Sequence, residues 1–332
     1  MSLDSRELSY SLAINEALHQ MMSKDERVFL IGQGVKSPWY VGNTARGLIE
    51  RFGEERVIDT PVSENSVTGV AVGAAIAGMR PIVVHPRMDF MLYALDPIIN
   101  EAANWHYMSG GASCVPVVFW GIINRGGEQA AQHSQALHSI FAHIPGLKVV
   151  MPATPYDAKG LMISAIEDDN PVVFIDDRWL YPLCEPVPSQ VYRVPIGKGV
   201  VRREGKDVSV IAISYMVGEA LNAASILSER YGIEIEVIDL RSIKPYDREL
   251  IRGCVKKSGR VILLDVGWTQ GGFMSEVAAF IVEECFYSLR SPLRRLALPD
   301  VPAPASRKLE EVYYPRSSEV VDLVLRVIKD GA

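Results

Sequence analysis

Short apolar runs alternate with longer amphipathic stretches along the first half of the chain. Residues 9–22 carry apolar side chains at helical spacing, and residues 28–32 form a continuous apolar run that ends at a glycine. Further runs typical of buried strands lie at 57–58, 81–84, 115–120, 147–150 and 172–175. Strands that are apolar on both faces and alternate with helices are typical of a parallel sheet covered by helices. The pattern therefore predicts a doubly wound α/β domain.

The second half of the chain repeats this alternation after an interruption. Four prolines between 182 and 195 stand in polar sequence and predict an interdomain linker. Beyond it, the pattern predicts strands at 208–213, 235–239 and 260–265, with helices at 216–231 and 272–286. We therefore expect a first domain at 1–185, a linker at 186–198 and a smaller α/β domain at 199–332.

Composition and charge narrow the class of protein. The 332 residues are 48% hydrophobic and 22% charged, with a net charge of −6, so no basic footprint for nucleic acid or an anionic membrane exists. No uncharged apolar stretch reaches 18 residues, and the four cysteines have no metal-binding or disulfide spacing. The first residues lack the apolar run of a secretion signal. We expect a cytoplasmic protein with reduced thiols, or a mitochondrial one that has lost its presequence.

One motif, at residues 59–78, places a carboxylate where α/β proteins bind ligands. A short strand stops at Pro61, Ser63 can cap the following helix, and Glu64 lies in the first helical turn. Small residues then recur every four positions, at Gly69, Gly73 and Ala77, so that one face of the helix is nearly bare. The pattern alone leaves two interpretations open: Glu64 faces a ligand at the carboxyl end of a strand, or it only complements the helix dipole.

This motif resembles the thiamine-diphosphate motif of the β subunit in the decarboxylase (E1) component of 2-oxo acid dehydrogenase complexes. Similar segments follow in the same order along nearly the whole chain, at 94–96, 100–103, 107–111, 131–135, 145–150, 157–161, 169–172, 203–208, 236–241 and 299–304. The resemblance implies a parallel-sheet pyrimidine-binding domain followed by a smaller transketolase C-terminal-like domain. It also implies oxidative decarboxylation of a 2-oxo acid, pyruvate or branched-chain, with transfer of the acyl group to a lipoyl domain.

The resemblance assigns roles in cofactor binding to three residues. Glu64 matches the carboxyl group that hydrogen bonds the aminopyrimidine ring of thiamine diphosphate and so promotes proton removal from the cofactor. Phe90 matches an aromatic residue that stacks on the same ring, although a phenylalanine in the core is the simpler interpretation of its pattern. Val62 is expected to contact the cofactor as well.

His133, within Gln132-His133-Ser134-Gln135, matches the active-site histidine of the family. An imidazole can donate or accept a proton near neutral pH, since its unperturbed pKa is about 6.5. The resemblance therefore implies that His133 protonates the lipoyl sulfur or stabilises negative charge on the substrate. A lone histidine is more often structural, which is the alternative here.

A potassium site is implied at the turn around residues 165–170. The family's ligands there are largely main-chain oxygens, which suit a hard cation. In this chain they correspond to Val117, Ala165, Ile166, Asp168 and Asn170. A solvated, Asp-rich turn is the alternative interpretation.

The chain contains no Gly-Asp-Gly sequence, which thiamine enzymes of this class use to hold magnesium and the diphosphate. The resemblance therefore implies half an active site, completed by a separate α subunit with Mg²⁺ in an α2β2 tetramer. The C-terminal domain is then expected to pair subunits and to dock the dihydrolipoyl acyltransferase core.

Several positions depart from the family pattern and leave the substrate open. Gln33 stands where an acidic residue is usual. His85-Pro86-Arg87 replaces a stretch that is typically acidic and apolar, and Ile122–Arg125 replaces a turn that usually contains proline. Two rival functions remain: the C-terminal subunit of a split transketolase-like or acetoin-type enzyme, and a scaffold without activity. Glu64, Phe90 and His133 together argue against the scaffold, and Gln132–Gln135 favours lipoyl-dependent transfer.

Overall fold

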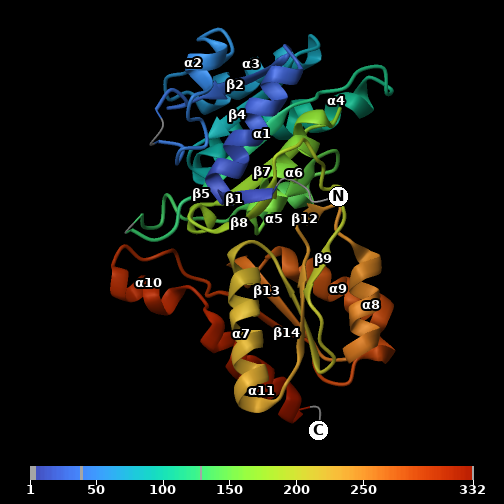
Figure 1. Ribbon diagram of the computed structural model, residues 1–332. Helices are drawn as coiled ribbons and strands as arrows, with labels where there is room; N and C mark the ends of the chain where they lie inside the picture. The colour runs from blue at the N-terminus through green and yellow to red at the C-terminus, as the bar shows by residue number, and fades with distance from the viewer. Residues whose placement is uncertain (1–4, 38–39, 128, 331–332) are drawn as a thin grey trace. The chain divides into compact units, whose positions relative to one another are not determined.

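The computed structural model describes residues 5–37, 40–127 and 129–330, and these fall into two compact units. The first unit contains residues up to Arg125 together with Gln132–Ile196, and the second contains Gly126–Ala131 together with the chain from Gly197 onward. Each unit has its own sheet and core, and we describe the two separately (Figure 1).

The first unit is built on a parallel sheet. Six of its strands run in the order β6-β7-β5-β4-β2-β3, as expected for a doubly wound domain. The strands of this unit are β1 (Ser5–Ser9), β2 (Val28–Gly32), β3 (Val57–Asp59), β4 (Arg80–His85), β5 (Val118–Ile123), β6 (Lys148–Val150), β7 (Val172–Asp177) and β8 (Cys184–Pro188). Strands β2, β5 and β7 are buried along their whole length, which explains their unbroken apolar sequences.

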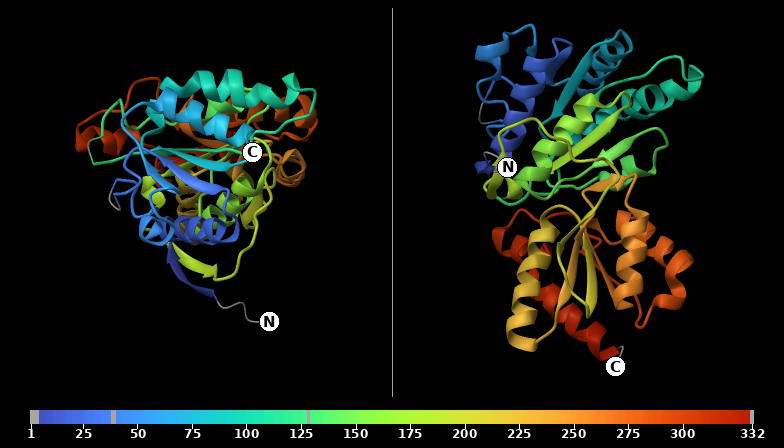
Figure 2. Two further views of the ribbon diagram at one scale, coloured as in Figure 1. Left: turned by 90° about the horizontal axis from the view of Figure 1, so that it is seen from above. Right: turned by 45° about the vertical axis from the view of Figure 1, so that its right-hand side comes forward.

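Helices cover both faces of this sheet. Helices α1 and α6 pack together on one face, and α3, η2 and α4 lie on the other (Figure 2). The helices of this unit are α1 (Tyr10–Lys24), α2 (Leu48–Phe52), α3 (Glu64–Ile76), the 3₁₀-helix η1 (Met88–Ala94), the π-helix η2 (Asp96–Ala102), α4 (Ala103–Met108), α5 (His138–His143), α6 (Pro155–Glu167) and the 3₁₀-helix η3 (Arg178–Leu180). Their arrangement leaves the carboxyl ends of the strands at one edge, where α/β proteins bind ligands.

Part of the predicted linker is a strand. Residues 186–188 belong to β8, which pairs antiparallel with β1. The two prolines in β8 lack an N–H, but a strand in a two-stranded sheet has one edge that needs no donor. Proline content alone therefore made this segment look like irregular chain.

The second unit contains a five-stranded sheet in the order β14-β13-β10-β11-β9, parallel except for β9. Helices α7 and α11 cover one face and α8 and α9 the other (Figures 1 and 2). The elements of this unit are β9 (Val200–Arg203), β10 (Val208–Ala212), α7 (Tyr215–Tyr231), β11 (Ile235–Asp239), β12 (Ser242–Lys244), α8 (Arg248–Ser258), β13 (Val261–Trp268), α9 (Phe273–Cys285), η4 (Phe286–Ser288), β14 (Arg294–Leu298), α10 (Arg307–Tyr313) and α11 (Ser317–Asp330).

The four cysteines are free thiols: Cys254 and Cys285 are buried, Cys184 is exposed and Cys114 is intermediate. Within the described ranges, no helix is both long and apolar enough to cross a lipid bilayer.

Candidate active site

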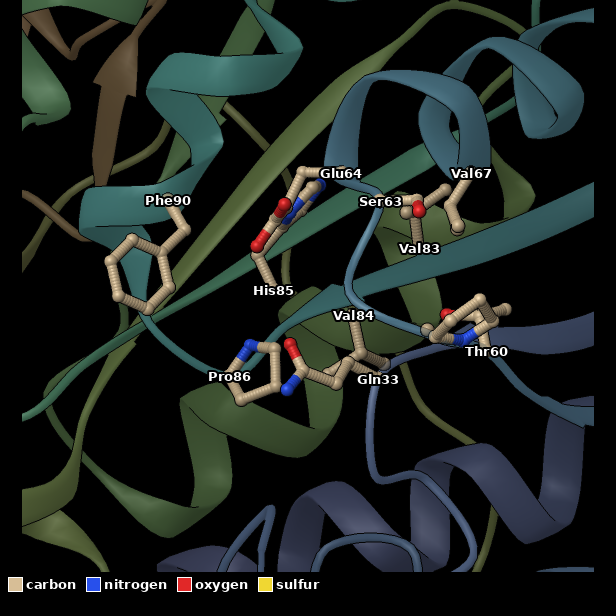
Figure 3. Close-up of a pocket in the computed structure, with 12 residues that line it drawn as sticks. Gln33, Thr60, Ser63, Glu64, Val67, Val83, Val84, His85, Pro86 and Phe90 are labelled. Carbon is tan, nitrogen blue, oxygen red and sulfur yellow. The ribbon is translucent and has the colours of Figure 1, made fainter.

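A small pocket that is partly open to solvent lies at the carboxyl ends of β2, β3 and β4 (Figure 3). Because these strands are parallel, the loops that follow them meet at the same edge of the sheet. The residues that line it are Gly32, Gln33, Thr60, Pro61, Ser63, Glu64, Val67, Val83, Val84, His85, Pro86 and Phe90. The sequence had singled out two of these, Glu64 and Phe90, as cofactor-binding residues.

Glu64 is the first residue of α3, with Ser63 in the N-cap position. The Ser63 side chain does not cap the helix, because its hydroxyl donates to the Val62 carbonyl at 2.7 Å instead. Figure 3 shows the Glu64 carboxylate and the Phe90 ring projecting from different elements into the pocket. No described residue hydrogen bonds to the Glu64 carboxylate, so it is available to a ligand.

Val62 is placed differently. Its side chain is 65% exposed and does not line this pocket. Its contact with a cofactor stays a prediction.

The His133 ring contacts the ring of Phe90, which lines the pocket. The two rings meet edge to face, with centroids 5.5 Å apart and an interplanar angle of 75°. The Asn124 amide N–H donates to the His133 carbonyl at 3.3 Å, and the Asn124 side chain donates to the Pro86 carbonyl at 2.8 Å. These bonds tie the loop after β5 to the loop after β4 and so place the histidine beside the pocket.

Asp89 anchors the same loop through Gln135. One of its carboxylate oxygens accepts hydrogen bonds from the Gln135 amide N–H at 3.3 Å and from the Gln135 side chain at 2.7 Å. Burial raises the pKa of the Asp89 carboxyl, and the Gln135 bonds and the positive charge available at His133 offset part of that rise. Sequence reasoning missed this pair, although Asp89 adjoins Phe90 and Gln135 belongs to the same motif as His133.

His85 lines the pocket at the end of β4, where the sequence had marked only a departure from the family pattern. Its side chain is buried, and burial lowers its pKa to about 4, so it is neutral at physiological pH. The His85 Nε2 atom lies 3.4 Å from the Thr68 hydroxyl, which is also buried. Since Thr68 stands one helical turn after Glu64, this contact connects the carboxylate-bearing turns of α3 to the sheet.

The turn predicted to bind potassium already holds positive side chains. Nη1 of Arg80 donates to the carbonyl oxygens of Ile166 and Asp168, at 3.0 and 3.1 Å. The Asp168 carboxylate pairs with Lys148 at 2.5 Å, and the Val117 carbonyl accepts from the Val172 amide at 3.0 Å. A carbonyl oxygen has two lone pairs, so the bonded carbonyls keep capacity for a cation.

A site for a divalent metal is not found in the part of the chain that the structure describes. No group of three or more His, Cys, Asp or Glu side chains is arranged there to hold a metal ion.

Two family models match the two units. The transketolase pyrimidine-binding domain matches residues 6–182, and the transketolase C-terminal domain matches residues 197–320. A pyruvate dehydrogenase E1 β-2 subunit from Oryza sativa is 42% identical and covers 96% of this chain and 86% of its own. A 2-oxoisovalerate dehydrogenase β subunit from Bacillus subtilis is also 42% identical, over 97% of this chain and 99% of its own. The chain belongs to the E1 β-subunit family of 2-oxo acid dehydrogenases.

Two further likenesses bear on the rival functions. The β subunit of an acetoin:2,6-dichlorophenolindophenol oxidoreductase from Bacillus subtilis is 40% identical and covers 98% of this chain and 99% of its own. A solved split-gene transketolase superposes with a TM-score of 0.79 over 98% of this chain and 99% of its own, at 23% identity. Because the two sequences are only 23% identical, the similarity between this transketolase and the present chain shows a shared fold and nothing about function.

Proposed function

We propose that this chain is the β subunit of a thiamine-diphosphate-dependent 2-oxo acid decarboxylase and supplies the pyrimidine half of its active site. The observation that carries the proposal is the pocket in which Glu64 and Phe90 converge, with the His133 ring packed against Phe90. Pyruvate and branched-chain 2-oxo acids are the first substrates to test, because relatives are named for them.

The pocket suits an aminopyrimidine ring. The Glu64 carboxylate, to which no described residue hydrogen bonds, projects from the start of α3, and the half-buried Phe90 ring offers a flat apolar surface. Bound thiamine diphosphate would supply the carbanion chemistry that decarboxylation of a 2-oxo acid requires. Glu64 would share a proton with a ring nitrogen of the pyrimidine, and Phe90 would hold the ring by stacking.

His133 would act beside Phe90. Its ring touches Phe90 and its loop is fixed by Asn124, so the imidazole is held where a proton can be delivered to an acceptor. We propose that the acceptor is the dithiolane sulfur of a lipoyl group, carried by an acyltransferase.

The partner and metals are finer parts of the same proposal. An α subunit would contribute the diphosphate and Mg²⁺ site in an α2β2 tetramer, since this sequence lacks Gly-Asp-Gly. Potassium would bind at the turn that follows α6, using the remaining lone pairs of the carbonyls that Arg80 contacts.

The proposal is tested by replacing the carboxylate. Glu64→Gln in the reconstituted tetramer is expected to lower decarboxylation by about 10²–10⁴-fold, because the amide keeps the shape but cannot share the proton. The assay is reduction of an artificial oxidant in the presence of a 2-oxo acid.

Glu50→Gln is the matched control, since Glu50 also lies in a first helical turn, that of α2, outside the pocket. It should leave the rate unchanged. Equal activity of Glu64→Gln and the wild type would contradict the proposal and leave Glu64 as a helix-dipole residue.

A further inference from the structure

The Asp89 carboxyl group, in η1, uses only one of its two oxygens within the described chain. The side chain is 4% exposed. Both hydrogen bonds from Gln135, the main-chain one at 3.3 Å and the side-chain one at 2.7 Å, go to the same oxygen, Oδ1. The other oxygen, Oδ2, is buried and has no hydrogen-bond partner among the described residues. A buried carboxylate oxygen without a partner costs stability, so Oδ2 is available to a further donor.

The imidazole of His133 is placed to be that donor. Asp89 immediately precedes Phe90, and Gln135 follows His133 by two residues, so the Gln135 bonds hold the two segments together beside both rings. The rings of Phe90 and His133 are in contact, with centroids 5.5 Å apart. Burial raises the pKa of the Asp89 carboxyl, and a positive charge on His133 opposes part of that rise. The carboxyl group and the imidazole are therefore neighbours.

Two other polar side chains adjoin Asp89 in sequence or across the loop, and both are poorer candidates. Arg87 is the other charged group that acts on Asp89, but it donates to the Pro86 carbonyl at 2.9 Å and lies over the Tyr40 ring. The Ser134 hydroxyl is buried and also lacks a hydrogen-bond partner among the described residues. A hydroxyl has no charge for the carboxylate to stabilise, whereas an imidazole gains a proton beside one.

We propose that Asp89 is the positioning residue of His133: its Oδ2 accepts the hydrogen bond of one imidazole N–H, which orients the ring and favours its protonated form. This inference rests on the proposed function. With one ring nitrogen held by the carboxylate, the other is free to face the acceptor. Asp89 itself touches neither substrate nor cofactor in this arrangement, and it takes up no proton.

The proton has a defined course in the transfer step. When the acyl group bonds to one sulfur of the dithiolane, the S–S bond breaks and its electron pair stays on the other sulfur. That sulfur takes the proton from His133, so the dithiolane is reduced and the acyl group is oxidised. The imidazole is left neutral and regains a proton from solvent. Since an acid works only in its protonated form, a carboxylate that favours that form extends transfer to higher pH.

Asp89→Asn tests the free oxygen alone, because an asparagine keeps one oxygen for both Gln135 bonds and replaces the other by an NH₂ donor. Acyl transfer to a lipoyl domain is measured against pH in the tetramer reconstituted with its α subunit. The alkaline limb of the profile should move down by about one pH unit, which lowers transfer about 10-fold at the alkaline end and little at the acid end. Reduction of an artificial oxidant should keep its wild-type rate. Asp96→Asn, which changes an exposed carboxylate in the first turn of η2, is the matched control.

A second measurement does not depend on activity. Diethyl pyrocarbonate reacts with the neutral imidazole, and mass spectrometry of peptides from the full chain gives its rate at each histidine. In the wild type, His133 should reach half of its maximal rate about one pH unit higher than in Asp89→Asn. His143, exposed at the end of α5, is the internal control. If Asp89→Asn does not fold, the lag of His133 behind His143 in the wild-type chain decides the matter.

The outcomes separate this inference from the proposed function. Identical pH profiles for Asp89→Asn and the wild type, or no shift in the modification of His133, would overturn the inference and leave Asp89 as an anchor of the loop. A parallel loss in transfer and in oxidant reduction would also overturn it, because Asp89 would then support the 2-oxo acid or Phe90. A tetramer inactive toward every 2-oxo acid, with the modification shift still present, would refute the proposed function alone.

Discussion

At the scale of single residues, contacts between side chains from different loops fix the position of His133 beside Phe90. Phe90 is contacted by His133, and the loop of His133 is fixed by Asn124 and by the Asp89–Gln135 pair. The histidine therefore has a defined position although it lies on an irregular segment. A defined position is what a proton donor needs in order to act on a group that is delivered to it.

His133→Ala should separate two steps of the proposed reaction. If the imidazole protonates the lipoyl sulfur, acyl transfer to a lipoyl domain should fall by about 10²–10⁴-fold, whereas reduction of an artificial oxidant should change little. Parallel rate measurements in the two assays check this. His143→Ala is the matched control, because His143 ends α5 with an exposed side chain.

A parallel loss in both assays would instead assign His133 to binding of the 2-oxo acid. No loss in either assay would remove it from the site.

His85 predicts a pH dependence of stability. Its pKa is about 4 in the folded chain against about 6.5 when unfolded, so between these values the unfolded state binds more protons. Stability from this residue is therefore present above pH 6.5 and lost as the pH falls toward 4. The free energy of unfolding attributable to His85 should be about 2 kcal/mol lower at pH 5 than at pH 7.

His85→Gln should remove this difference, because glutamine does not titrate. Urea unfolding at pH 5 and pH 7, followed by a signal from the first unit, measures the difference. His143→Gln changes an exposed histidine and should keep the wild-type difference in unfolding free energy between the two pH values. If His85→Gln kept the wild-type difference in unfolding free energy between pH 7 and pH 5, other groups would cause the acid sensitivity.

The site was predictable from sequence only in part. Glu64, Phe90 and His133 could be named because their motifs are contiguous and resemble a known family. His85, Thr68 and the Asp89–Gln135 pair could not, since their roles come from contacts between segments that are distant in the chain. An isolated histidine at the end of an apolar strand is the only local signal that His85 offers.

At the scale of elements, the apolar runs predicted most central strands within one or two residues. The run at 115–120 is an exception, because the strand β5 begins at Val118 and extends to Ile123. Pro116 has no N–H for a ladder bond, so pairing starts after it. The short edge elements β9 and β14 and the helices α10 and α11 were not predicted.

The turn after α6 gives an element-scale prediction. Arg80→Met removes the guanidinium that donates to the Ile166 and Asp168 carbonyls, and it should lower the free energy of unfolding by about 2–3 kcal/mol, because buried carbonyls lose a charged donor. Denaturant unfolding measures the loss, with Arg27→Met as control, since the exposed Arg27 side chain pairs with the carboxylate of Asp25 and donates to no main-chain carbonyl among the described contacts.

The same measurement tests the proposed potassium site. Exchange of NaCl for KCl at equal ionic strength should raise the unfolding midpoint of the wild type. Equal midpoints in the two salts would show that Arg80 and Lys148 supply all the positive charge this turn uses.

At the scale of the whole molecule, the chain carries the pocket that we propose for the pyrimidine and lacks the motif that binds a diphosphate with Mg²⁺. Charge-assisted contacts to its phosphates are the strongest hydrogen bonds that a protein can offer a diphosphate cofactor. The purified chain alone should therefore fail to bind thiamine diphosphate at micromolar concentration in the presence of Mg²⁺, and the chain mixed with its α subunit should bind it. Isothermal titration calorimetry on both samples measures this, with the reconstituted Glu50→Gln tetramer as a control for assembly. Stoichiometric micromolar binding by the chain alone would refute the split site, because the phosphate contacts would then have to lie within this chain.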